Sequence, residues 1–352
     1  MSSSPSAAVS SAAGPTFGGI AQPPSFRELF WDRLFRQTAL GLAVFTVIIT
    51  LYVVYRIGAV AMPAVHAYGL NFLTGTTWDA TRDNYAILPA IVGTLYSSIL
   101  GLIIGTLFGL AIAIFLSERF LAIALESLLK RFGIEEEGFW ASVPDRIENV
   151  LRTIVELLAA IPSVVYGLWG IFVVIPVIRP PADWLHNHLA WIPFFNTPLS
   201  GPGLLPASIV LAIMVLPTIS AISRDALVAV PPKIREAAFG IGATRWEAIL
   251  AIFLPTAATG ILGAILLGFG RALGETMALA MLAGNANVLS WSFFSPANTL
   301  AALLANHFPE AGTVEVGALM YAALVLLAIT LIVNIIGTLI LQHANAGLEG
   351  LR

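Results

Sequence analysis

The chain has 352 residues, of which 58% are hydrophobic and only 11% are charged, with a mean hydropathy of +0.89 and a net charge of −3. A soluble protein carries about 25% charged residues, so this composition excludes an ordinary soluble enzyme and predicts a polytopic membrane protein. The sequence contains no cysteine, which excludes disulfides and thiolate chemistry.

The first 25 residues are rich in Ser, Ala, Pro and Gly and carry no charge. Such a segment cannot bury enough surface to order itself. A secretory signal has basic residues before its apolar core, whereas here Arg27, Arg33 and Arg36 follow the segment. We therefore expect residues 1–25 to form a disordered cytoplasmic tail and residues 26–352 to form a transmembrane domain.

Six apolar segments are long enough to cross a membrane, because a helix needs about 20 residues to span the hydrocarbon. Their apolar runs are unbroken rather than alternating, which predicts helices and excludes a β-barrel. We thus predict an all-α membrane protein with six transmembrane helices, at about 37–62, 88–116, 151–178, 204–223, 254–283 and 314–341.

The basic residues are distributed very unevenly between the loops. With the N-terminus inside, 13 of the 17 Lys and Arg residues fall on the cytoplasmic side. The outer loops hold only Arg82 and Arg179, and Arg56 and Arg271 fall within spans. Because positive charge is retained inside, both termini are expected to be cytoplasmic.

The outer loops are rich in aromatic residues, including Trp78, Trp184, Trp191 and Trp291. These residues fit interfacial aromatic belts, and a docking surface for an external partner is the alternative. His186 and His188 lie about 200° apart on a helix and have no acidic cluster nearby, so no metal site is expected.

Two inner loops have helical character. Residues 117–150 mix charge with Leu, Phe and Trp at helical spacing, which indicates an amphipathic helix. In residues 231–255, Pro231 and Pro232 begin a short helix, and Ile234, Ala237, Ala238 and Ile241 form an apolar stripe. Gly240 and Gly242 end that helix, and Thr244 with Glu247 forms a capping box that opens a second.

This second loop resembles the EAA loop of the ABC importer permeases. The resemblance rests on Glu236-Ala237-Ala238, then Gly242, and finally Ile252 and Leu254-Pro255 at the spacing of that motif. It implies the type I importer permease architecture. It also implies that the loop docks on a separate cytoplasmic ATPase subunit through Glu236, Ala237, Ala238 and Gly242. An ordinary amphipathic connector is the alternative.

The fifth apolar segment contains the charged stretch GFGRALGETMAL at 268–279. In a continuous helix, Arg271 and Glu275 share one face and can pair. A charge at the centre of a span costs about 2.5–3.5 kcal/mol, so this face should point at protein or at a water-filled path. Either the pair fixes helix packing, or Arg271 attracts an anion, for which its planar fork suits phosphate-like oxygens.

The same stretch, together with LLAAIPSVVYGLWG at 157–170, resembles the phosphate-specific (Pst) subgroup and in particular its C-type permease. The resemblance implies a phosphate path with Arg271 and Glu275, and Pro162 and Ser163 match the third-span motif. It also implies a heterodimer with an A-type permease, two ATP-binding subunits and an extracytoplasmic phosphate-binding protein, in contact with membrane lipid of the bacterial inner membrane. No nucleic-acid partner is expected.

The cofactors are expected on a partner, because neither lysine closes a G-x-x-x-x-G-K-[ST] phosphate loop. The resemblance places ATP and Mg on the ATPase and none on this chain, which is a transport subunit rather than an enzyme. One alternative is an importer of the same class for another oxyanion, such as sulfate or phosphonate. An ion-coupled transporter would leave the EAA loop without a purpose, and a membrane enzyme would need a nucleophile or metal cluster that is not visible.

Overall fold

The computed structural model describes residues 26–131 and 143–349 of the chain. It divides the chain into two units, the first ending at Arg56 and the second beginning at Ile57. The tail predicted at 1–25 lies outside the described residues, as do residues 132–142 of the inner loop. The two units are described separately below.

Unit 1 contains the first part of a single helix, α1 (Phe26–Tyr68). Its apolar side chains are exposed in every direction, and none in its most apolar stretch is buried. A helix that is apolar all round is stable in lipid or under protein cover rather than in water. This part of the chain therefore has the character of a membrane span.

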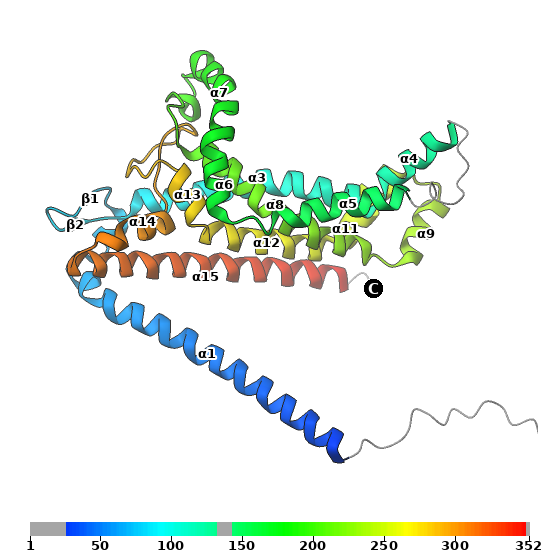
Figure 1. Cartoon of the computed structure of the whole chain (residues 1–352), viewed down its shortest axis with the longest axis horizontal. Coiled ribbons are helices and arrows are strands. Elements are labelled where there is room, and N and C mark those ends of the chain that lie inside the picture. The colour runs from blue at the N-terminus through cyan, green and yellow to red at the C-terminus, as the bar shows by residue number, and fades with distance from the viewer. Residues whose placement is uncertain (1–25, 132–142, 350–352) are drawn as a thin grey trace, which may run out of the picture. The chain divides into compact units, whose positions relative to one another are not determined.

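Unit 2 is organised around four long helices that run side by side (Figure 1). Three of them cover the apolar segments expected at 88–116, 204–223 and 314–341. The only strands in the described residues are two of two residues each, so the prediction of an all-α membrane protein is confirmed. The four helices are α3 (Leu88–Ser117), α8 (Leu204–Val228), α12 (Ala258–Gly274) and α15 (Thr313–Glu349).

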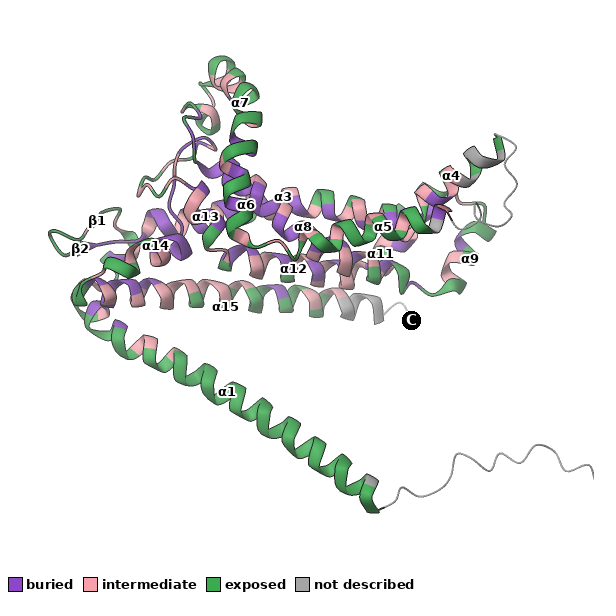
Figure 2. Cartoon of the chain, viewed as in Figure 1, coloured by how far each residue is buried: buried purple, intermediate pink, exposed green. Residues whose placement is uncertain are grey.

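Helix α8 is the centre of unit 2, with 61% of its apolar window inside the protein (Figure 2). Small residues let α3 approach it closely. A Cβ added at Gly105 of α3 would lie 2.6 Å from a methyl group of Val215 and 3.1 Å from the carbonyl oxygen of Ala212. Gly101 and Gly109, one turn away on either side, make similar approaches, so this face of α3 is lined by glycine.

The segment expected to be a continuous span at 151–178 is interrupted. Helix α5 (Val143–Leu158) ends before Pro162, and the chain continues as α6 (Ser163–Trp169), the π-helix η2 (Gly170–Val174) and α7 (Ile175–Leu189). Pro162 has no N–H to donate and restricts the residue before it, which explains the break. The apolar helix long enough to span is 163–189, which extends into the expected outer loop.

The segment expected to be one span at 254–283 is also broken. The short helices α10 (Arg245–Ala248), η4 (Ile249–Phe253) and α11 (Leu254–Thr256) meet α12 at an angle of 71°. Helix α12 ends at Gly274, and α13 (Met277–Leu282) follows after two residues. In the part of the chain that is described, five helices can span a membrane, or six if the bent pair counts as one span.

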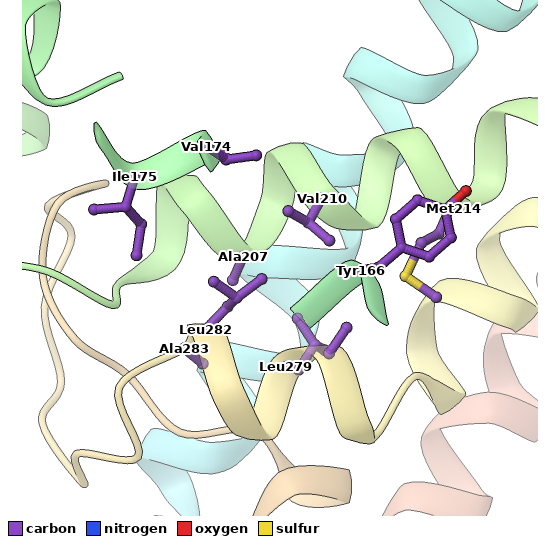
Figure 3. Close-up of a cluster of buried hydrophobic side chains, with 10 residues drawn as sticks. Tyr166, Val174, Ile175, Ala207, Val210, Met214, Leu279, Leu282 and Ala283 are labelled. Atoms are coloured by element: carbon purple, nitrogen blue, oxygen red, sulfur yellow. The ribbon is translucent and has the colours of Figure 1, made fainter. Parts of the chain in front are cut away.

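A buried cluster holds α6 and α13 against α8, on either side of these breaks (Figure 3). Tyr166 of α6, Met214 of α8 and Leu279 of α13 belong to it. The Tyr166 hydroxyl donates a hydrogen bond of 2.7 Å to the carbonyl oxygen of Leu158, at the end of α5. The cluster thus holds the start of α6 and α13 in place, and the charged stretch at 268–279 leads into α13.

Several short helices and two short strands lie at the end of unit 2 that is opposite the EAA-like loop (Figure 1). The strands β1 (Trp78–Asp79) and β2 (Asn84–Tyr85) pair antiparallel, with Trp78 opposite Tyr85. Phe72 and Tyr85 pack in a cluster with the first turns of α15. The remaining elements at this end are α2 (Asn71–Thr74), η3 (Pro193–Phe195), α14 (Leu300–His307) and η5 (Phe308–Glu310).

The glycine contact between α3 and α8 predicts a difference between two matched substitutions. Gly105→Ala should destabilise the purified protein by about 1–3 kcal/mol, because the new methyl group overlaps Val215. Gly263→Ala on α12 should have almost no effect, because nothing lies within 4 Å of the added Cβ. Thermal unfolding in detergent measures both, and equal unfolding temperatures for the two variants would contradict the packing.

Candidate functional site

The EAA-like loop forms a helix, a turn and a second helix. Helix α9 (Pro232–Gly240) begins at the predicted prolines, and Gly242 takes a φ of +86° in the turn that follows. The predicted capping box is confirmed: the Glu247 N–H donates to the Thr244 hydroxyl at 3.4 Å, and the Thr244 N–H donates to the Glu247 carboxylate at 2.8 Å. Short-range chemistry therefore fixes the shape of this loop.

Arg235 anchors α9 to the rest of unit 2. Its guanidinium pairs with the Glu118 carboxylate at 2.7 Å, where α3 ends, and donates to the Leu227 carbonyl oxygen in α8 at 2.7 Å. It also lies over the Phe253 ring, 4.5 Å from the centroid. One side chain thus ties α9 to the ends of α3 and α8 and to η4.

The predicted coupling residues do not all lie on one face. Glu236, Ala237 and Gly242 are exposed, whereas Ala238 is only 2% exposed and packs in the core beneath the loop. The expected apolar stripe is likewise not buried as a whole, since Ala238 is buried but Ile241 is 81% exposed. The partner-facing candidates are therefore the three exposed residues, and Ala238 holds α9 in place.

Sequence reasoning missed two kinds of residue in this loop. Phe239, Ile241 and Trp246 are large apolar side chains that remain exposed around the turn. Trp246 also stacks on Phe120, the first residue of α4 (Phe120–Arg131), with ring centroids 5.4 Å apart. The exposed aromatic residues could have been noticed in the sequence, but the Arg235–Glu118 contact joins residues 117 positions apart.

The second candidate site lies where α12 ends. Arg271 is in the last turn of α12 and is partly buried. Its guanidinium donates a long hydrogen bond of 3.3 Å to the Thr218 hydroxyl, on the neighbouring helix α8. No other hydrogen bond or ion pair of Arg271 is found within the described residues, so most of its donors remain available for a ligand.

The expected ion pair between Arg271 and Glu275 is not formed, and that expectation is wrong. Glu275 lies beyond the end of α12 with φ −68° and ψ 127°, an extended conformation, so the two residues are not one helical turn apart. The partly buried Glu275 carboxylate instead accepts a hydrogen bond of 3.3 Å from the Ala278 N–H, in the first turn of α13. Glu275 therefore caps a helix.

A break of this kind brings several polar groups into an apolar segment. The Thr276 hydroxyl donates to the Gly274 carbonyl oxygen at 3.1 Å, and Asn334 of α15 lies near Gly270, 3.8 Å from the Cβ that a side chain would add there. Together with Arg271 and Thr218, these groups come from α8, α12, α15 and the turn between α12 and α13. The arrangement can hold a small anion by hydrogen bonds to a guanidinium, without a metal or a nucleophile.

The two histidines of the outer side bond separately to the backbone. The His186 Nδ1 lies 2.8 Å from the Phe195 carbonyl oxygen, and the His188 Nδ1 lies 2.8 Å from that of Trp184. Among residues 26–131 and 143–349, no three His, Asp or Glu side chains gather in a way that could hold a metal ion.

The Arg235 anchor predicts a local change in the dynamics of α9. Arg235→Gln leaves the mostly buried Glu118 carboxylate unpaired, at a cost of about 1.5–3 kcal/mol. If α9 opens locally, its amides should then exchange hydrogen roughly ten to a hundred times faster. Lys233→Gln, an exposed change on the same helix, should leave exchange unaltered, and unchanged exchange in Arg235→Gln would contradict the anchor.

The chain is similar to proteins of known family. Residues 138–348 match the family described as binding-protein-dependent transport system inner membrane component. The phosphate transport system permease protein PstC of Pasteurella multocida is 36% identical over 317 residues, which cover 89% of this chain and 92% of that protein. The PstC of Haemophilus influenzae is 34% identical over 321 residues, covering 90% of this chain and 95% of that protein.

A solved structure supports the fold. A chain of a bacterial alginate ABC transporter, in complex with a periplasmic protein that holds an alginate pentasaccharide, superposes with a TM-score of 0.54 at 18% identity. The likeness covers 88% of this chain and 98% of that chain. The protein is thus a multi-pass membrane protein, and it belongs to the family of inner membrane components of binding-protein-dependent transport systems.

Proposed function

We propose that this chain is the membrane-spanning permease subunit of an ATP-driven importer that carries inorganic phosphate across the bacterial inner membrane. The observation that carries the proposal is the partly buried Arg271 guanidinium, which has one long hydrogen bond at the break of an apolar helix. The relatives with the highest similarity reported above are named as phosphate transport permeases, which favours phosphate over other oxyanions.

In this proposal Arg271 binds the anion in transit. Two N–H groups of its planar fork donate to two oxygens of the phosphate, replacing part of the water shell that the anion loses on entering. Thr218 positions the guanidinium from the neighbouring helix. The Glu275 carboxylate, four residues away along the chain, repels the anion and keeps its binding weak enough for release.

The energy comes from partners. In the proposal, two copies of an ATPase subunit bind ATP and Mg, and one of them contacts α9 through Glu236, Ala237 and Gly242. An A-type permease completes a heterodimer, and an extracytoplasmic phosphate-binding protein delivers the anion. The anchor at Arg235 supports this coupling, because it ties α9 to the ends of α3 and α8.

Substitution of Arg271 tests the anion path. In cells without another phosphate importer, Arg271→Gln should reduce uptake of radiolabelled phosphate at least about tenfold, since a hydrogen bond to a charged group contributes roughly 1.5–3 kcal/mol. Arg271→Lys should retain an intermediate rate, because it keeps the charge and loses the fork. Co-purification with the ATPase and ATP hydrolysis are measured in each variant as controls for assembly.

Two results would contradict this assignment. Normal uptake by Arg271→Gln would remove Arg271 from the path, and loss of the assembled complex would make its role structural. If sulfate or phosphonate inhibited the uptake of radiolabelled phosphate as strongly as unlabelled phosphate does, the substrate would be assigned to another oxyanion.

The two roles given to Glu275 can be separated. Glu275→Gln keeps an oxygen that can accept the Ala278 N–H, so thermal stability should not change, but the loss of charge should slow phosphate release and lower the maximal uptake rate. Glu275→Ala also loses the cap and should cost about 0.5–2 kcal/mol of stability. Unaltered uptake by Glu275→Gln would leave the residue with a capping role alone.

A further inference from the structure

A polar pocket of about 430 Å³ opens between the ends of α3 and α8 and the side of α5. Arg119, Glu148, Asn149, Arg152 and Arg224 contribute to its wall. A smaller pocket adjoins it and shares Arg152 and Arg224. None of these residues belongs to the proposed path at Arg271 or to the exposed face of α9. The volume is in the range of small-molecule sites in proteins.

The charges around this pocket do not balance. Three guanidinium groups face one carboxylate, that of Glu148, in its lining. Glu148 is 15% exposed and lies 3.7 Å from Arg119, a loose contact. Among the described residues, the carboxylates of Glu156 and Asp225 also lie near, in the lining of the smaller pocket, and are 52% and 72% exposed. Water and salt screen exposed charges of either sign, and Arg224, at 22% exposed, is the least screened of the three guanidinium groups.

Arg224 shows the imbalance most clearly. Its side chain is only 22% exposed, and its ion-pair partner is the neighbouring residue Asp225, at 3.4 Å. A contact of that length to a solvated carboxylate stabilises little, whereas removing a guanidinium from water is costly. Arg152 is better paired, with Glu156 at 2.7 Å on its own helix, but it also lines both pockets. Among the described residues, Arg224 therefore has only this weak partner, and it lines both pockets.

The chemistry of the wall selects one class of ligand. Guanidinium groups that converge on a pocket bind phosphate oxygens through paired, charge-assisted hydrogen bonds. Asn149 adds a neutral amide that can donate as well. The described residues of the wall include one carboxylate, which by itself cannot hold a metal cation, and no aromatic ring that could stack on a nucleobase. Leu116 and Val228 at the edge are compatible with either a free anion or the start of an acyl chain.

We propose that this pocket between α3, α5 and α8 is a binding site for a phosphate group, carried either by inorganic phosphate or by the headgroup of an anionic lipid. Helix α5, which forms one side of the pocket, lies at the same end of unit 2 as α9 (Figure 1). The chain segment 117–119 contributes to both: Ser117 and Arg119 line the pocket, and Glu118 between them pairs with Arg235 of α9. Arg119 itself has a φ of +51°, a conformation rare outside glycine, so the segment is held in a defined shape.

The pocket therefore adjoins the proposed coupling element. A phosphate group bound to Arg224 of α8 and Arg152 of α5 would hold these two helices together beside the end of α3, where Glu118 anchors α9. With the orientation expected from the basic residues, the site faces the cytoplasm and the cytoplasmic leaflet. It is in a place to respond to phosphate that has already been imported, or to the charge of the lipid around it.

The test uses the full-length chain assembled with its partner subunits and purified in detergent. Inorganic phosphate is titrated by equilibrium binding, in the parent and in an Arg271→Gln background, so that binding at the proposed path does not contribute. Arg224→Gln and Arg152→Gln should each weaken binding at least about tenfold, as expected when a charge-assisted contact is lost. Arg224→Lys should weaken it less, and Arg36→Gln, an exposed arginine of unit 1, should leave it unchanged.

A second arm separates the two sources of the phosphate group. The complex is placed in vesicles of phosphatidylcholine containing phosphatidylglycerol, and the phosphatidylglycerol that remains after purification is measured by mass spectrometry. Retention by the parent and loss from Arg224→Gln, without binding of inorganic phosphate, assigns the site to a lipid headgroup. If neither probe distinguishes Arg224→Gln from Arg36→Gln, the proposal is overturned, whatever the effect of Arg271→Gln on transport.

Discussion

The structure depends on how unit 2 satisfies the backbone and charged groups that its broken helices expose in an apolar setting. In hydrocarbon, no water replaces a lost hydrogen bond, so a helix can break only where protein groups take over. The Tyr166 hydroxyl serves the end of α5 by bonding to the Leu158 carbonyl oxygen. The Glu275 carboxylate serves the start of α13. Both breaks lie against the same buried cluster on α8.

Local features of the sequence were predictable for local reasons. The capping box of Thr244 and Glu247 and the prolines that begin α9 depend on residues within one helical turn, and the structure has both. The lengths of the apolar segments likewise predicted α3, α8 and α15, because the thickness of the hydrocarbon layer sets the length of a spanning helix. Membership in the permease family follows from the EAA-like spacing, and the relatives confirm it.

The sequence predictions that were wrong or missing concern features that depend on tertiary packing, which residue spacing does not report. The i, i+4 spacing of Arg271 and Glu275 predicts a pair only if the helix continues, and it ends at Gly274. Two glycines at 270 and 274 weaken that turn, but the decision is made by packing of α13 against α6 and α8. Pro162 was visible in the sequence, yet whether a proline bends or ends a helix depends on the group that accepts the freed bonds. The Arg235–Glu118 pair joins distant parts of the chain and leaves no local signal.

The three arginines Arg235, Arg271 and Arg224 differ in how closely other protein groups contact them. Arg235 has close partners, with a carboxylate at 2.7 Å, a carbonyl oxygen at 2.7 Å and an aromatic ring beneath it. Among the described residues, Arg271 and Arg224 each have one polar partner, at 3.3 and 3.4 Å. A guanidinium that must transmit motion needs short contacts with protein, because a loose contact would absorb the movement. A guanidinium that must bind and release an anion needs donors left over, because strong protein partners would compete with the ligand. The contrast in contacts therefore agrees with the roles that we propose, coupling for Arg235 and phosphate binding for Arg271 and Arg224.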